Sequence, residues 1–229
     1  MIPSFKTKLA AGDTVIVVNP DHPSSSLVEF IGRLGVDAVM IDTEQGSPDV
    51  ESVEEMARAA RVAGLCALVR IYSPEANIIE RYMFRGIHGI IVPRVDSGAQ
   101  ARKVVEDVRY CFPNNFQEKV VIVQIESAAA VRDIDAFLAV PEIDCFFIGV
   151  VDLSKSLGFK GDYRAPEVVR QIDGTIEKIL AAGRRVGIMV KEDDLAAWRR
   201  KGVQFLYTHL NDFAVMGADR FQKLLAAAD

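Results

Sequence analysis

The sequence lacks the marks of several large classes of protein. Its three cysteines are odd in number and far apart, which argues against a disulfide framework and against a Cys-x-x-Cys metal clamp. No run of about 18 uninterrupted apolar residues occurs, and residues 1–13 have no apolar signal-peptide core. We therefore expect a soluble protein of a reducing compartment, the cytoplasm.

A block of charge of one sign is also missing. The 27 basic and 32 acidic residues are mixed along the chain and give a net charge of −5. Nucleic acids and anionic membranes bind basic patches, so we expect neither as a partner and predict a small-molecule partner instead. No glycine-rich phosphate-binding loop follows the first apolar run, where the sequence reads NPDHPSSS instead. This argues against a dinucleotide-binding protein and a P-loop protein.

What the sequence does contain is a regular alternation of two patterns. Eight short apolar, β-branched runs occur at residues 14–20, 38–44, 66–72, 89–95, 120–126, 144–153, 184–190 and 204–212. They are continuous rather than alternating, which is typical of strands covered by helices on both faces. Helical patterns with capping serines, early acids or final glycines fill the gaps at residues 24–35, 49–64, 98–111, 129–142, 166–183 and 191–202.

This alternation predicts an α/β fold, a (β/α)8 TIM barrel, with residues 1–229 forming a single domain. An open doubly wound sheet is the alternative. A barrel places its chemistry at the carboxyl ends of the strands. The polar residues expected there are Asn19, His22, Asp42, Glu44, Gln45, Arg70, Arg94, Gln124, Glu126, Asp152, Lys191, Asn211 and Asp212.

These residues favour a site for a hard divalent cation. Carboxylates without clustered histidines or thiols suit Mg²⁺ or Mn²⁺, and Glu126 with Asp152 is the best pair of metal ligands. Such a metal chelates a 2-oxo acid and stabilises its enolate. Arg70 suits the developing oxyanion.

Five segments carry a resemblance to a known family. DTEQG, VRI, GIIVPRV, VQIES and IGVVDLSKSLG follow the order and approximate spacing found in the HpcH/HpaI aldolase family. The resemblance implies a modified TIM barrel that forms a homo-oligomer, a trimer or a hexamer. It also implies a divalent metal, Mg²⁺ or Mn²⁺ with Co²⁺ as a further option, which binds a 2-oxo acid such as pyruvate for reversible aldol cleavage.

The resemblance also assigns roles to residues. It makes Glu126 and Asp152 metal ligands, Arg70 the contact to the pyruvyl oxygen, and Glu44 the residue that orders a metal-bound water. The backbone from Gly149 to Asp152, including Val151, would hold the substrate carboxylate. We add Gln124 as a further substrate-binding residue because it ends the same predicted strand as Glu126.

The sequence departs from the family at the acid–base dyad. Family members read D-x-E-H where this chain has Gln45, an amide that does not transfer protons near neutral pH. The aspartate expected as the partner of that histidine is Phe84. The family's G-P-x-D has Val150 for its proline, and a long glycine- and arginine-rich stretch is cut to CFPNNFQEK.

The sequence also suggests roles for the three histidines, for Gln45, for Arg94 and for Asp42. His22 is the histidine placed to replace the missing base, whereas His88 and His209 are interpreted as structural residues. Gln45 would hydrogen-bond the substrate, and Arg94 would bind a second carboxylate or serve as an ion-pair partner. Asp42 is either a structural cap or an arginine partner.

The predicted function is a metal-dependent carbon–carbon lyase, an aldolase or decarboxylase, that acts on a 2-oxo acid through an enolate. A citrate-synthase-like or citrate-lyase-like condensation or cleavage on the same barrel is the first alternative. A non-catalytic homologue that binds metal and a 2-oxo acid is the second.

Overall fold

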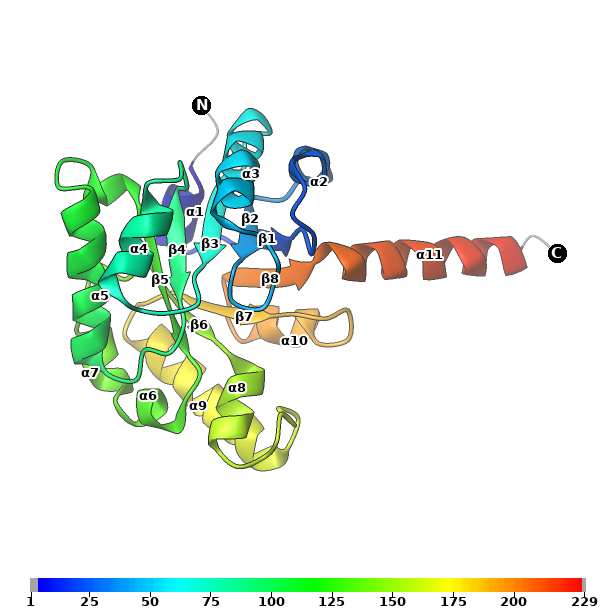
Figure 1. The fold of residues 1–229 in the computed structure, drawn as a ribbon. Coiled ribbons are helices and arrows are strands. Elements are labelled where there is room, and N and C mark those ends of the chain that lie inside the picture. The colour runs from blue at the N-terminus through cyan, green and yellow to red at the C-terminus, as the bar shows by residue number, and fades with distance from the viewer. Residues whose placement is uncertain (1–3, 228–229) are drawn as a thin grey trace.

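The computed structural model describes residues 4–227 and shows a closed barrel of parallel strands (Figure 1). Each strand pairs with the next, and β1 closes the ring on β8 with Asn19 opposite His209. The strands are β1 Val15–Asn19, β2 Ala38–Asp42, β3 Cys66–Arg70, β4 Gly89–Val92, β5 Val120–Ile125, β6 Cys145–Ile148, β7 Val186–Met189 and β8 Phe205–His209. The predicted (β/α)8 barrel is therefore confirmed, and the open sheet is wrong.

Helices surround this barrel and cover its outer face (Figure 1). Side chains of Ser24, Asp49, Ser97 and Ser127 accept hydrogen bonds from first-turn N–H groups, which explains why four of the helices begin where they do. The helices are α1 Phe5–Ala11, α2 Ser25–Ile31, α3 Val50–Val62, α4 Ala76–Met83, α5 Gly98–Cys111, α6 Ala128–Arg132, α7 Ile134–Leu138, α8 Val150–Ser156, α9 Pro166–Ala181, α10 Leu195–Arg200 and α11 Leu210–Ala226, with 3-10 turns at Gly32–Leu34 and Phe116–Glu118.

Several element boundaries differ from the predictions. The run 144–153 is a strand only to Ile148, so Asp152 lies in the first turn of α8 rather than on a strand. The run 204–212 is a strand only to His209, which places Asn211 and Asp212 in α11. The helix predicted over 129–142 is interrupted at Asp133, and α1 and α4 were not predicted. After Ile148 the apolar residues Val150, Val151 and Leu153 continue the run and conceal the end of the strand.

The barrel interior is filled by aromatic packing. Phe147 lies edge-on against both Phe205 and Tyr207, with ring centroids 5.7 and 5.8 Å apart. Phe5, from α1, packs edge-on against Phe205 at 6.0 Å. Such contacts add to the burial of apolar area and close the interior below the site. The carboxyl ends of the strands are left as the open end.

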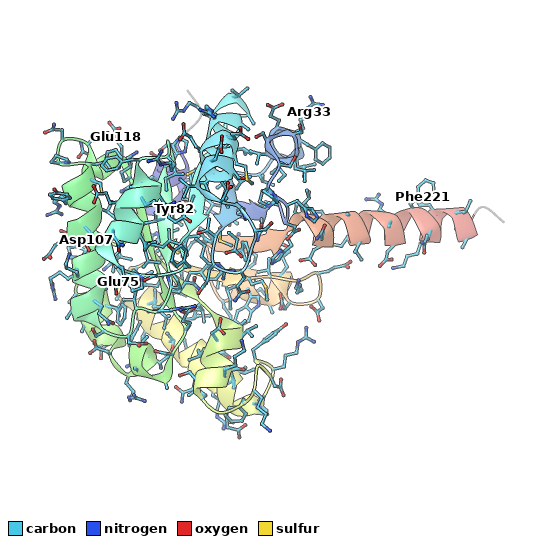
Figure 2. The ribbon with its side chains drawn as sticks, viewed as in Figure 1. Arg33, Glu75, Tyr82, Asp107, Glu118 and Phe221 are labelled. Carbon is cyan, nitrogen blue, oxygen red and sulfur yellow. The ribbon has the colours of Figure 1, made fainter. Side chains whose placement is uncertain are left out.

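The last helix, α11, is different from the others because it extends away from the barrel (Figure 1). None of its residues is buried, and Figure 2 shows Phe221 on its outer part, far from the barrel. Met216 is exposed on this helix. Within residues 4–227, no helix combines the length and the apolar character that crossing a membrane requires.

Gly89, in β4, provides a test of barrel packing. A Cβ atom there would lie 2.3 Å from the carbonyl oxygen of Val120, a backbone atom that moves only with its strand. We expect Gly89→Ala to lower the free energy of unfolding by about 1–3 kcal/mol. Gly174→Ala is the matched control, because that glycine is inside α9 with open space around it and should gain about 1 kcal/mol. Equal melting temperatures for the two variants would contradict this packing.

Candidate active site

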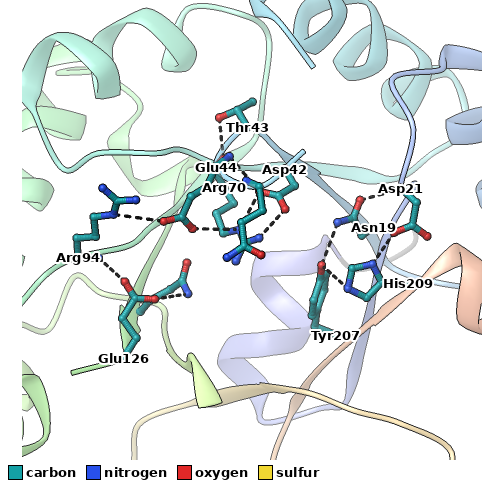
Figure 3. Close-up of polar contacts among 12 residues, drawn as sticks. Asn19, Asp21, Asp42, Thr43, Glu44, Arg70, Arg94, Glu126, Tyr207 and His209 are labelled. Atoms are coloured by element: carbon teal, nitrogen blue, oxygen red, sulfur yellow. Dashed lines mark hydrogen bonds and ion pairs between the residues drawn. The ribbon is translucent and has the colours of Figure 1, made fainter. Parts of the chain in front are cut away.

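A cavity of about 350 Å³ lies at the carboxyl ends of the strands. This size suits a small molecule. Most of the predicted site residues line it, namely Asn19, His22, Asp42, Gln45, Arg70, Gln124, Gly149, Val151 and Asp152. Glu44, Arg94 and Glu126 are joined to this group through hydrogen bonds and ion pairs (Figure 3). The structure thus brings these residues together. It does not bring in the other predicted rim residues, because Lys191 and Asp212 pair with each other at 2.8 Å beside a different hollow and Asn211 is exposed on α11.

Asp42 holds Arg70 in place between the ends of β2 and β3. The guanidinium of Arg70 donates to both carboxylate oxygens of Asp42, at 2.9 and 2.5 Å. Asp42 Oδ1 also accepts the backbone N–H groups of Glu44 and Gln45. Burial is the largest effect on the pKa of Arg70 and acts to lower it, but the hydrogen bond to Asp42, the charge of Asp42 and the charges of Tyr207 and Glu44 together raise that pKa. Of the two uses predicted for Asp42, the structure shows the arginine partner.

Glu44 lies between two arginines. Its carboxylate is 3.5 Å from Nε of Arg70 and 3.4 Å from Nε of Arg94. Burial raises the pKa of Glu44 despite both cations. Arg94 has a left-handed backbone, with φ of +58°, and its N–H donates to Oε1 of Glu126 at 2.7 Å. Its side chain is 65% exposed, so the guanidinium is free to turn toward a ligand.

Glu126 is the most perturbed acid of the site. Burial raises its pKa to about 7, and the charges of Glu44 and Asp152 add to this effect. Its Oε2 accepts the side-chain amide of Gln124 at 2.8 Å, whereas Oε1 of Gln124 is buried without a hydrogen-bond partner. Gly149 is required beside it, since a Cβ there would lie 2.7 Å from the Cβ of Glu126.

The donor set fits a hard divalent cation. Carboxylates that raise one another's pKa are stabilised by a cation between them, and the two candidate ligands, Glu126 and Asp152, both donate oxygen. Asp152 is 41% exposed, and its Oδ1 bonds to Lys155 at 2.9 Å. Across residues 4–227 no three acidic, histidine or cysteine side chains form a ready metal cluster. Protein ligands would therefore be few, as Mg²⁺ tolerates.

A second polar network, which the sequence analysis missed, lies on the other side of the cavity (Figure 3). His209 ends β8, lines the cavity and has a side chain that is 30% exposed, so its interpretation as a core residue is wrong. Its ring bonds to Asp21 and to the hydroxyl of Tyr207, which in turn bonds to Asn19. A histidine two residues before the polar pair Asn211 and Asp212 was the available signal.

The structure also shows where His22, Phe84 and Gln45 lie. His22, the predicted replacement base, is exposed at the rim of the cavity. Phe84 follows α4 and packs against Phe112, with ring centroids 5.8 Å apart, and both belong to the lining of a different hollow. Gln45 lines the main cavity where the family has its histidine.

Comparison with known proteins identifies the family. Residues 21–214 match the sequence profile described as HpcH/HpaI aldolase/citrate lyase, and the chain belongs to this family. A hydroxypyruvate/pyruvate aldolase of Agrobacterium fabrum is 30% identical, over 94% of this chain and 87% of that protein. A 4-hydroxy-2-oxovalerate aldolase of Rhodococcus jostii is 31% identical, over 85% and 84%.

Among solved structures, the citrate synthase SbnG superposes with a TM-score of 0.85 and 26% identity, over 99% of both chains. The predicted family and the predicted class, a carbon–carbon lyase of the aldolase type, are confirmed. The roles assigned to individual residues stay predictions.

The raised pKa of Glu126 gives a prediction for stability. Between pH 4.5 and about 7 the folded protein binds a proton that the unfolded chain releases, so stability falls as pH rises through this range. Glu126→Gln removes the buried charge. We expect the variant to gain up to about 3 kcal/mol at pH 8 and little at pH 4, measured by urea unfolding with a chelator.

The control for this measurement is Glu177→Gln, on the exposed face of α9. It should match the wild type at both pH values. A Glu126→Gln variant that is no more stable than the wild type at pH 8 would show that the carboxylate is well solvated.

Proposed function

We propose that the chain is a divalent-metal-dependent lyase that cleaves or forms a carbon–carbon bond next to a 2-oxo acid through its enolate. The observation that carries the proposal is the buried Glu126, with a pKa of about 7, in the electrostatic field of Asp152 and Arg70. A buried carboxylate with so strongly raised a pKa is typical of a functional site. The aldolase relatives support the same chemistry.

Each residue then has a defined task. Glu126 and Asp152 would hold Mg²⁺ or Mn²⁺, which supplies Lewis-acid stabilisation of the enolate. Arg70, fixed by Asp42, directs its charge at the enolate oxygen. The first N–H groups of α8 line the cavity beside Gly149 and Val151, have no partner within the helix and suit the substrate carboxylate. Glu44 pairs with both Arg70 and Arg94 and offsets the repulsion between the two guanidinium groups at the site.

A citrate-synthase-like condensation is the second candidate. The similarity to SbnG favours it, as does the exposed guanidinium of Arg94, which suits a second carboxylate. The two reactions use the 2-oxo acid differently, because an aldolase forms its enolate whereas a citrate-type condensation uses its carbonyl carbon as the electrophile. The residues that would bind the 2-oxo acid suit either reaction.

The first test is decarboxylation of oxaloacetate with Mg²⁺ or Mn²⁺. Loss of CO₂ generates the enolate without removing a proton, so the reaction needs only the metal ligands and Arg70. We expect a metal-dependent rate that Asp152→Ala reduces by at least about 10²-fold, since electrostatic groups contribute on this scale. Asp135→Ala, whose side chain is 82% exposed on α7, is the control. An unchanged rate in Asp152→Ala would place the metal elsewhere.

We also propose that the chain works as a homo-oligomer, a trimer or a hexamer, of single-domain subunits formed by residues 1–229. The support is α11, which has no buried residue and exposes the apolar side chains Val215, Met216, Phe221, Leu224 and Leu225. Several exposed apolar side chains on one helix are typical of an interface. The free cysteines support a cytoplasmic location.

Sedimentation analysis tests the oligomer. We expect Phe221→Glu to shift the protein toward monomers, because a buried charge without a partner is costly at an interface. Gln222→Glu, one position further along the same helix, adds the same charge and is the control. A wild-type protein that sediments as a monomer would contradict the proposal.

A further inference from the structure

A closed cycle of hydrogen bonds lies beside the cavity where β1 and β8 meet (Figure 3). The backbone N–H of Asp21 bonds to Asn19 Oδ1 at 2.9 Å, and Asn19 Nδ2 bonds to the Tyr207 hydroxyl at 3.0 Å. That hydroxyl is 3.2 Å from His209 Nε2, and His209 Nδ1 is 2.5 Å from Asp21 Oδ1. Asp21 Oδ2 also accepts the N–H of Asn211 at 2.8 Å.

The direction of every bond in this cycle follows from its donors. The N–H of Asp21 only donates, so Asn19 presents its oxygen there and donates its amide to Tyr207. The Asp21 carboxylate only accepts, so a neutral His209 carries its proton on Nδ1 and accepts at Nε2 from the Tyr207 hydroxyl. One lone pair of that hydroxyl remains for a further donor.

The free lone pair belongs to a group that lines the substrate cavity. Tyr207 and His209 line the same cavity as Arg70 and Gln45. Burial raises the pKa of the Tyr207 hydroxyl, while the charges of Arg70 and Asp42 act on it in opposite directions. The hydroxyl therefore keeps its proton unless it passes it to a neighbour.

The backbone of Asp21 shows that this arrangement carries strain. Its φ is +64°, a left-handed conformation that is uncommon for residues other than glycine. Strained residues of this kind persist where the surrounding contacts determine them, often at functional sites. Here both carboxylate oxygens and the N–H of Asp21 are engaged.

We propose that Asp21, His209 and Tyr207 form a proton relay that replaces the family's missing dyad, with the Tyr207 hydroxyl as the group that contacts the substrate. This inference rests on the proposed function. His209 and Asp21 act through Tyr207, and Asp21 stays ionised and stabilises the imidazolium, as in a Ser-His-Asp triad.

The relay accepts and returns the one proton that moves during the cleavage of a 4-hydroxy-2-oxo acid. Tyr207 takes the proton of the C4 hydroxyl while its own proton passes to Nε2 of His209. The C4–O electrons form the aldehyde, the C3–C4 bond breaks, and its electron pair forms the enolate. The proton then returns from His209 through Tyr207 to C3 of the enolate, which gives the shorter 2-oxo acid as the other product. Addition runs the same steps in reverse.

The test separates proton transfer from enolate stabilisation. Exchange of the methyl protons of pyruvate with D₂O requires a base, whereas oxaloacetate decarboxylation does not. In Tyr207→Phe and His209→Asn we expect exchange to fall by about 10²–10⁴-fold, the usual contribution of acid–base catalysis. Decarboxylation should change by no more than several-fold. Asp21→Asn, which preserves shape, should lose exchange in the same selective way.

Tyr110→Phe is the matched control, since Tyr110 is 79% exposed on α5, and it should keep exchange. His22→Asn tests the rival base, the exposed histidine of the same cavity. Exchange that survives in Tyr207→Phe, or is lost instead in His22→Asn, would overturn the relay. An equal loss of both reactions in folded variants would show a purely structural network and overturn it too.

The wild-type protein separates the two proposals. Metal-dependent decarboxylation without any exchange overturns the relay and leaves the proposed function standing. Absence of both reactions overturns the proposed function, and the relay with it.

Discussion

The ion pair between Arg70 and Asp42 is the interaction on which the rest of the site depends. A buried guanidinium is tolerated only when it is paired and hydrogen-bonded, and Asp42 supplies two bonds to it. The same carboxylate accepts the N–H groups of Glu44 and Gln45 and so sets the loop after β2. Asp42 therefore fixes both the position of the Arg70 guanidinium at the cavity and the backbone of Glu44, whose carboxylate lies between the two arginines.

The candidate metal ligands and the proposed relay occupy opposite sides of this cavity. Glu126, Asp152 and Arg70 come from the β3 to β6 side, whereas Tyr207 and His209 come from β8. The separation has an electrostatic consequence: a cation beside an imidazole opposes its protonation, so a base placed near the candidate metal ligands would lose strength. The closed barrel makes this separation possible, because strands far apart in the ring face the same cavity.

The sequence predicts the barrel well, since eight continuous apolar runs leave few other folds. It also predicts Glu126, Gln124 and Arg70 correctly as neighbours, because the ends of parallel strands meet at one rim. It fails for the pair of Asp21 and His209, which are 188 residues apart. Their contact depends on the register of β1 with β8 and on the left-handed turn at Asp21, and neither has a local signal. Asp152 was placed on a strand because VVDL is as apolar as the strand before it.

Gln45 gains a simple meaning in this arrangement. Gln45 lines the cavity on the β2 side, and its amide has hydrogen-bond donors and an acceptor but does not transfer a proton near neutral pH. With the proposed relay on the β8 side, the proton leaves and returns from a different wall of the cavity than in a protein with histidine at this position. The face of the enolate that receives the proton, and the room left for the aldehyde, are then set by Tyr207 rather than by the loop after β2. A family of enolate-forming barrels can in this way keep its metal centre and change its partner substrates by moving the acid–base group alone.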